Sequence, residues 1–121
     1  MAAHRMGVDG VPVVWLAGGG MFGLYYWNVH ALAAGFTTSV LYDRLGTGWS
    51  DVVDLPRPGS RVTDDLRELL EAIGLPGPYV LVGHSLGGLY ARLFAKRFPD
   101  DVAGLVLLDP THEDIATFLA R

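Results

Sequence analysis

The chain has 121 residues, half of them hydrophobic, and a formal net charge of −4 from 13 acidic and 9 basic residues. This length and composition predict one domain with a core of ordinary size and exclude a disordered chain. The acidic balance argues against nucleic acid and anionic membrane surfaces as partners. Without cysteine there are no disulfides, thiolate nucleophiles or Cys-based zinc sites.

No stretch approaches the roughly 20 apolar residues that cross a bilayer, and the first residues lack the apolar segment of a signal peptide. We therefore expect a cytoplasmic protein without a membrane partner. We also expect no metal and no cofactor.

Four apolar runs rich in β-branched residues alternate with helical patterns, which predicts right-handed βαβ units around a parallel sheet. The predicted strands cover residues 12–16, 37–42, 79–82 and 103–108. The predicted helices cover residues 24–34, the segment that follows Ser60 as N-cap, and the segment from Leu86 to the residue before Pro99. The fold class is therefore α/β, a three-layer sandwich with about four parallel strands.

The second predicted helix is amphipathic. Its apolar residues recur with helical spacing at Val62, Leu66, Leu69, Leu70 and Ile73. Its opposite face is polar and carries Arg61, Asp64, Arg67, Glu68 and Glu71. The pattern predicts a helix that packs its apolar face on the sheet.

The turn after the first predicted strand is rich in glycine and can be interpreted in two ways. Gly18, Gly20 and Gly23 satisfy GxGxxG, and Asp43 follows 20 residues later at the end of the next strand, so a Rossmann-type dinucleotide site is one alternative. Large aromatic residues at 25–27 argue against it, because that fingerprint needs small residues where the helix packs closely.

The segment Gly83-His84-Ser85-Leu86-Gly87 lies between an apolar strand and a helical pattern. This is the strand, sharp turn and helix context of a nucleophile elbow, with Ser85 at the strained position. Glycines two residues before and after the serine, Gly83 and Gly87, allow the strand and the helix to approach closely. Ser85 is the first candidate for a reacting atom.

On these residues the chain resembles the first half of an α/β-hydrolase of the serine esterase or peptidase type. Besides the elbow, matching segments lie at residues 16–20, 42–51 and 107–114, in the family's order and spacing. The resemblance implies a strand order of second, first, third, fourth in this chain's count. It also implies that the backbone N–H groups of Leu86 and Gly19 stabilise an oxyanion. It further implies that Asp43 and Arg44 tie the second strand's end to the oxyanion turn, and the alternative for these two residues is a solvated ion pair.

The general base is the difficult assignment. The resemblance places the acid and the histidine after later strands, which this chain lacks, so residues 1–121 form a single partial domain. A compact alternative uses Asp109 and His112, although three residues are a short separation and Asp109 is also a natural turn former before Pro110. Because His84 precedes Ser85 in the turn, we expect it to point away from the serine as a packing residue, and neither His4 nor His30 has a reason to reach the serine.

The expected function is hydrolysis of a small-molecule carboxylic ester or amide through an acyl-enzyme on Ser85. An alternative of another class is a non-catalytic hydrolase-like fragment or binding module. The last predicted strand is apolar at consecutive positions, and such a strand at a sheet edge needs a cover. We therefore expect self-association, or a missing complementary half, at the exposed strand edge.

Overall fold

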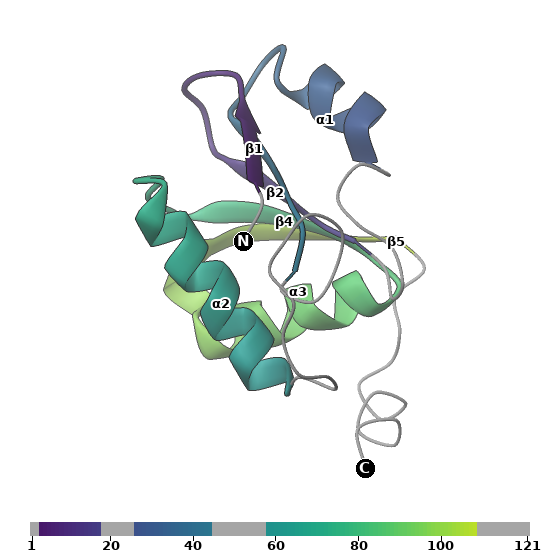
Figure 1. Cartoon of the computed structure of the whole chain (residues 1–121), viewed down its shortest axis with the longest axis vertical. Helices are drawn as coiled ribbons and strands as arrows, with labels where there is room; N and C mark the ends of the chain where they lie inside the picture. The colour runs from purple at the N-terminus through teal and green to yellow at the C-terminus, as the bar shows by residue number, and fades with distance from the viewer. Residues whose placement is uncertain (1–2, 18–25, 45–57, 109–121) are drawn as a thin grey trace.

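The computed structural model describes residues 3–17, 26–44 and 58–108 (Figure 1). Within these residues the strands are β1 Ala3–Met6, β2 Val13–Leu16, β3 Ser39–Tyr42, β4 Tyr79–His84 and β5 Val102–Leu108. The helices are α1 Trp27–Ala33, α2 Gly59–Ala72 and α3 Leu86–Arg97, and the 3-10 turn η2 Pro99–Asp101 precedes β5.

The strands form one sheet in the order β1-β3-β2-β4-β5. β3, β2, β4 and β5 are mutually parallel, whereas β1 pairs antiparallel with β3. α1 covers one face of the sheet, and α2 and α3 cover the other, which gives three layers (Figure 1). The predicted fold class and the predicted order of the four parallel strands are confirmed, and β4 lies between neighbours on both sides.

Alternate residues of each central strand face opposite layers, so the core has two parts. The larger part lies under α2 and α3 and contains Val14, Leu16, Val40, Tyr42, Leu66, Leu69, Leu70, Leu75, Tyr79, Leu81, Ala91 and Phe94. The smaller part lies under α1 and contains Trp15, Ala33, Leu41 and Val82. The apolar face predicted for the second helix is buried at Val62, Leu66, Leu69 and Leu70.

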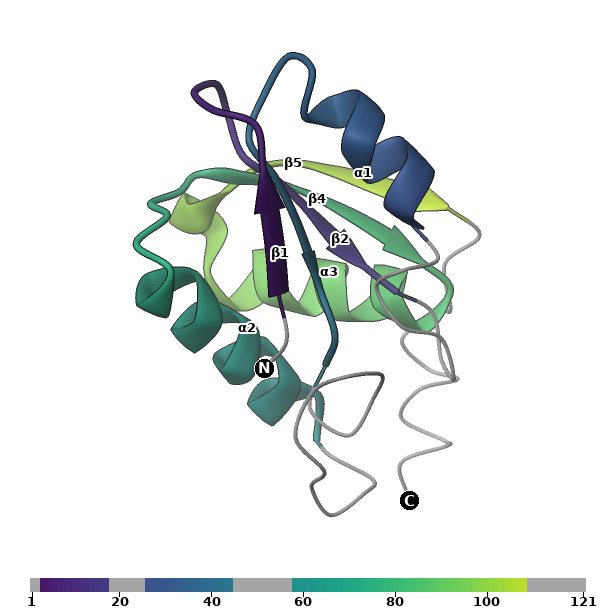
Figure 2. The ribbon, with the colours of Figure 1, turned by 45° about the horizontal axis from the view of Figure 1, so that its top comes forward.

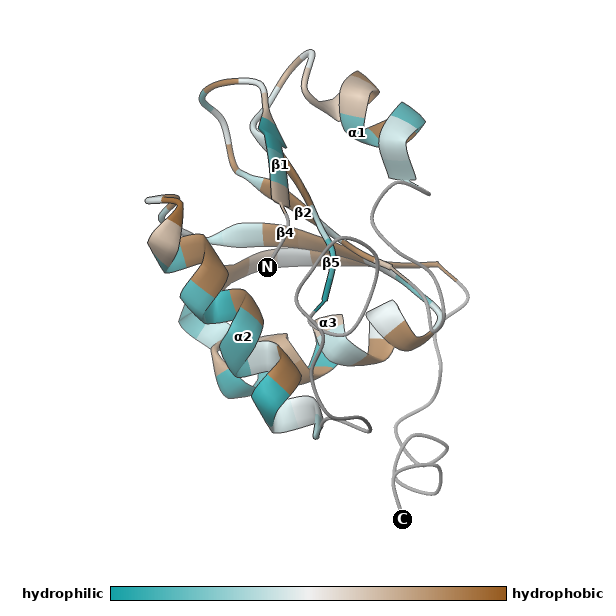
Figure 3. Cartoon of the chain, viewed as in Figure 1, coloured by the Kyte–Doolittle hydropathy of each residue, from teal (hydrophilic) through white to brown (hydrophobic). Residues whose placement is uncertain are grey.

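The sequence did not reveal β1. The strand has only four residues, three of them exposed, and carries His4 and Arg5 where a buried strand would have apolar residues (Figure 3). It joins the sheet through backbone pairing with β3, from Ala3 opposite Tyr42 to Met6 opposite Ser39. A short polar edge strand has no hydrophobic pattern to recognise.

The predicted N-cap at Ser60 is wrong. α2 begins at Gly59 after Pro58, and no side chain of the described residues caps it. The extended backbone of Pro58, at φ −57° and ψ 145°, directs the chain into the helix, so Ser60 already lies within the first turn. The Ser60 carbonyl instead accepts hydrogen bonds from Thr63 and from Arg97 of α3.

No helix within the described parts of the chain is both long and apolar enough to cross a membrane.

Candidate active site

The candidate site lies at the sheet edge where the parallel strands end. β2 and β4 finish side by side, with Leu16 opposite Gly83, and β5 finishes with Leu108 opposite His84. α3 begins at the same edge, immediately after β4, and the start of α1 also lies there (Figure 2). In open α/β sheets, ligands bind outside the carboxyl ends of the strands, so a substrate site is expected at this edge.

Ser85 is the single residue between β4 and α3. Its backbone has φ 53° and ψ −119°, a conformation that a residue with a side chain adopts at a cost of about 1–3 kcal/mol. Hydrogen bonds on both sides hold it there. The Ser85 N–H donates to the carbonyl of Leu108 at 3.1 Å, and the Ser85 carbonyl accepts from the N–H groups of Gly88 at 2.9 Å and Leu89 at 3.3 Å.

The two glycines that flank the elbow lie where a side chain would collide with backbone. A Cβ on Gly83 would lie 2.5 Å from the carbonyl oxygen of Gly87. A Cβ on Gly87 would lie 2.1 Å from the carbonyl oxygen of Leu16 and 2.5 Å from that of Ala17. The predicted reason for both glycines, close approach of strand and helix, therefore agrees with the geometry.

Leu86, the predicted oxyanion donor next to the nucleophile, is the first residue of α3. The first N–H groups of a helix have no intrahelical acceptor, and the helix dipole is positive at this end. The Leu86 N–H is therefore one of the helix N-terminal amides, which stabilise a negative charge that develops near them. Gly19, the second predicted donor, lies outside the described residues, as do Gly18, Gly20 and Gly23 of the dinucleotide alternative.

Arg44 joins the end of β3 to the end of β2. Its guanidinium donates to the carbonyl of Ala17 at 2.5 Å and lies 5.2 Å from the centre of the Tyr90 ring. Asp43 and Arg44 are both buried, with exposed fractions of 5% and 8%. A solvated ion pair is therefore excluded for these residues, and Arg44 holds the backbone immediately before the glycine-rich turn.

Two tyrosines near this edge, Tyr42 and Tyr26, have raised pKa values and therefore keep their hydroxyl protons at neutral pH. Burial raises the pKa of Tyr42 to about 12, and the charge of Arg44 only partly opposes that shift. The Tyr42 hydroxyl is buried and has no hydrogen-bond partner among the described residues. Burial also raises the pKa of Tyr26, against a backbone hydrogen bond from His84 and the charge of Arg44.

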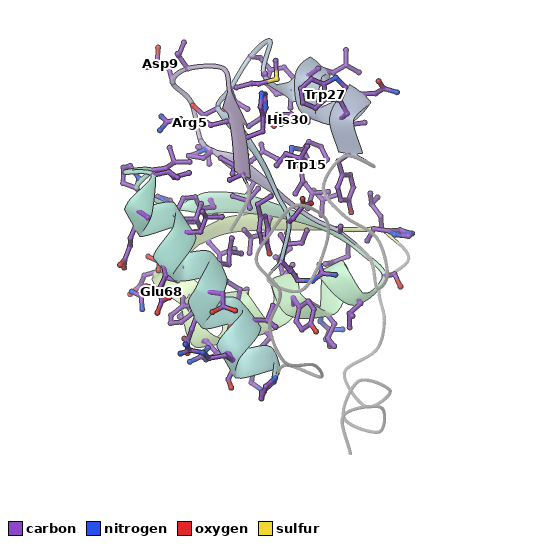
Figure 4. All side chains as sticks on the ribbon, viewed as in Figure 1. Arg5, Asp9, Trp15, Trp27, His30 and Glu68 are labelled. Atoms are coloured by element: carbon purple, nitrogen blue, oxygen red, sulfur yellow. The ribbon has the colours of Figure 1, made fainter. Side chains whose placement is uncertain are left out.

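The described histidines have other contacts or lie on the elbow itself. His30 is fully buried between α1 and the sheet (Figure 4). Its Nδ1 lies 2.6 Å from the Ser39 hydroxyl, which accepts from the Trp15 indole at 2.8 Å, and its Nε2 lies 3.0 Å from Nδ1 of His4. Burial lowers the pKa of His30, with a further contribution from His4. His84 is half-buried at the end of β4.

The compact acid and base alternative, Asp109 and His112, lies outside the described residues. In the described part of the chain, no group of three or more His, Cys, Asp or Glu side chains could hold a metal ion.

Sequence reasoning missed two polar features near the site. One is the buried chain from His4 through His30 and Ser39 to Trp15. The other is Tyr26, whose hydroxyl donates to the Leu16 carbonyl at 2.9 Å. Neither had a periodic signal, because each joins residues from different elements.

A strained serine between a parallel strand and a helix, at the carboxyl edge of a three-layer α/β sheet, defines the class of proteins with a nucleophile elbow. The sequence profile described as the alpha/beta hydrolase fold matches residues 11–120. The chain belongs to this family, as its four sequence segments predicted.

Individual relatives agree with that membership. Uncharacterized protein YqjL of Bacillus subtilis is 34% identical over 115 residues, covering 95% of this chain and 46% of that protein. The human (Lyso)-N-acylphosphatidylethanolamine lipase is 36% identical over 107 residues, covering 84% of this chain and 31% of the lipase. A thermophilic esterase from Thermogutta terrifontis superposes with a TM-score of 0.85 at 30% identity, covering 90% of this chain and 40% of the esterase.

The chain thus spans less than half the length of each of these three relatives. It corresponds to part of the fold.

Proposed function

We propose that Ser85 is the nucleophile of a serine hydrolase that cleaves small-molecule carboxylic esters or amides. The Ser85 oxygen attacks the carbonyl carbon, a general base takes the hydroxyl proton, and the oxyanion is stabilised by the N–H groups of Leu86 and Gly19. Collapse expels the alcohol or amine, which takes up a proton, and leaves an acyl-enzyme. Water then releases the acid and restores the serine.

The observation that carries this proposal is the backbone of Ser85, strained at φ 53° and held by hydrogen bonds at the strand edge. Backbone strain of this kind persists only where the surroundings impose it, and it is concentrated at functional sites. The names of two relatives, a lipase and an esterase, favour an ester or amide as substrate.

A fluorophosphonate probe tests the nucleophile directly, because it reacts covalently with an activated serine. We expect the wild-type chain to gain one adduct, located on Ser85 by peptide mass spectrometry, and Ser85→Ala to gain none. Cleavage of a p-nitrophenyl ester is measured alongside. Adducts of equal yield on wild type and Ser85→Ala would reject Ser85 as the nucleophile.

The same assay addresses the base. If Asp109 and His112 serve Ser85, His112→Ala loses ester turnover. If the base belongs to a longer form of the protein, His112→Ala keeps whatever turnover the wild type has.

A second candidate function is a non-catalytic fragment or binding module. It is favoured by the apolar residues exposed on β5, where Leu105 is 39% exposed and Val106 and Leu108 are each 45% exposed. Size-exclusion chromatography with the ester assay separates the candidates. A monomer that gives a burst of product without turnover indicates a half-site, whereas an inert aggregate indicates a fragment.

The dinucleotide alternative is less favoured, because Asp43 would have to bond to a ribose hydroxyl but is 95% buried beside Arg44, and because the family match accounts for the same glycine-rich turn. A thermal-shift titration with NAD(H) tests it. Stabilisation by the nucleotide would support this alternative.

A further inference from the structure

Tyr26 is the N-cap residue of α1, and this end of the helix lies at the sheet edge where β2 and β4 end (Figure 2). Its hydroxyl donates to the carbonyl of Leu16, the last residue of β2, at 2.9 Å. Its ring lies 5.3 Å from that of Trp15 and is half-buried against the smaller part of the core. The side chain is thus fixed at both its ring and its hydroxyl.

The backbone of β4 approaches the same Leu16 carbonyl from the neighbouring strand. The Val80 N–H donates to the Pro12 carbonyl of β2 at 2.8 Å. In a parallel ladder, alternate residues of a strand bond to the same neighbouring strand. Two such steps along both strands lead from Val80 and Pro12 to His84 and Leu16, so the His84 N–H is directed toward the Leu16 carbonyl. Tyr26 lies at that last rung, because its hydroxyl donates to the same Leu16 carbonyl.

The residues that follow Leu16 and His84 in the chain belong to the site. Ala17, after Leu16, accepts from Arg44 and precedes the glycine-rich turn. Ser85, after His84, is the strained residue of the elbow. A change in the separation of Leu16 and His84 would therefore move the nucleophile relative to the oxyanion turn.

We infer that Tyr26 is a positioning residue for Ser85, because its hydroxyl holds the Leu16 carbonyl at the rung where β2 meets the end of β4, and so fixes the elbow relative to the end of β2. This inference rests on the proposed serine chemistry. Tyr26 itself touches no reacting atom, and its raised pKa keeps it a neutral donor at ordinary pH. The hydroxyl can therefore donate to the Leu16 carbonyl without carrying charge.

Tyr26→Phe tests the inference because it removes the hydroxyl and keeps the ring. Tyr79→Phe is the matched control, since the Tyr79 hydroxyl also donates to a backbone carbonyl, that of Leu75 at 2.5 Å, but lies at the opposite end of β4. The measurement is amide hydrogen exchange by NMR on the full 121-residue chain. We expect exchange at His84 to rise about tenfold in Tyr26→Phe and to stay near the wild-type rate in Tyr79→Phe.

The second measurement is the rate of fluorophosphonate labelling at Ser85. We expect it to fall about tenfold in Tyr26→Phe and to be unchanged in Tyr79→Phe, at similar losses of thermal stability. Unchanged amide exchange at His84 in Tyr26→Phe would overturn the inference. If the wild type is labelled, an unchanged labelling rate in Tyr26→Phe would also overturn it. If the wild type does not label, the proposed function fails, whereas exchange at His84 still decides the role of Tyr26.

Discussion

Gly87 is the residue that brings α3 against the end of β2. A methyl group there would lie 2.1 Å from the carbonyl oxygen of Leu16, a fixed backbone atom that also accepts from Tyr26. We expect Gly87→Ala to lower the free energy of unfolding by about 3 kcal/mol or more, because strand and helix must separate. Urea denaturation monitored by circular dichroism measures the loss.

Gly104→Ala is the control for that variant. Among the described residues, a Cβ at Gly104 would meet only the Val80 side chain, at 4.0 Å, and this position lies in β5 of the same sheet. We expect a change within about 0.5 kcal/mol. Equal losses in the two variants would show that the close contact at Gly87 does not limit stability.

At the scale of elements, His30 links α1 to both β3 and β1. It contacts Ser39 and His4, and its ring lies 5.7 Å from that of Trp27 (Figure 4). Burial lowers its pKa below the ordinary 6.5, so the unfolded chain binds a proton more readily than the folded one. The stabilising contribution of neutral His30 is therefore complete above pH 6.5 and is lost as pH falls toward the lowered value.

We expect the wild type to lose more stability than His30→Gln when the pH falls below 6.5, by at most about 1.4 kcal/mol per pH unit. Glutamine keeps a polar group facing Ser39 but does not titrate. Urea denaturation of both proteins above and below that pH gives the difference. Parallel pH profiles would contradict the assignment of a neutral buried His30.

The same elements show what the sequence could and could not predict. The parallel strands and α2 were predictable, because a strand buried on both faces or a helix buried on one has a repeating apolar pattern. β1 was not, because its place depends on backbone pairing with β3 and on the contact of His4 with His30. Local spacing similarly identified Ser85 and its glycines, whereas Tyr26 reaches the end of β2 only through the packing of α1.

At the scale of the whole molecule, β5 leaves one edge of the sheet without a pairing strand among the described residues. The Leu108 carbonyl accepts from Ser85, so Leu108 and the alternate residue Val106 direct their backbone groups toward β4. The backbone N–H and C=O groups of Leu105 and Leu107 point away from β4, to the outer side of the sheet edge. The edge thus combines available hydrogen-bonding groups with exposed apolar side chains, the combination that promotes pairing between chains.

We expect the chain to self-associate through this edge at high concentration, and Val106→Lys to weaken the association at least about tenfold, because charged side chains on an edge strand, above all lysine, oppose pairing with another chain. Val106 is 45% exposed, so the folded monomer tolerates lysine there. Val8→Lys is the control, since Val8 is 77% exposed in the loop between β1 and β2, away from the edge. Sedimentation velocity over a concentration series measures both. If the two variants associate equally, or if the wild type stays monomeric throughout the series, the β5 edge is not the contact.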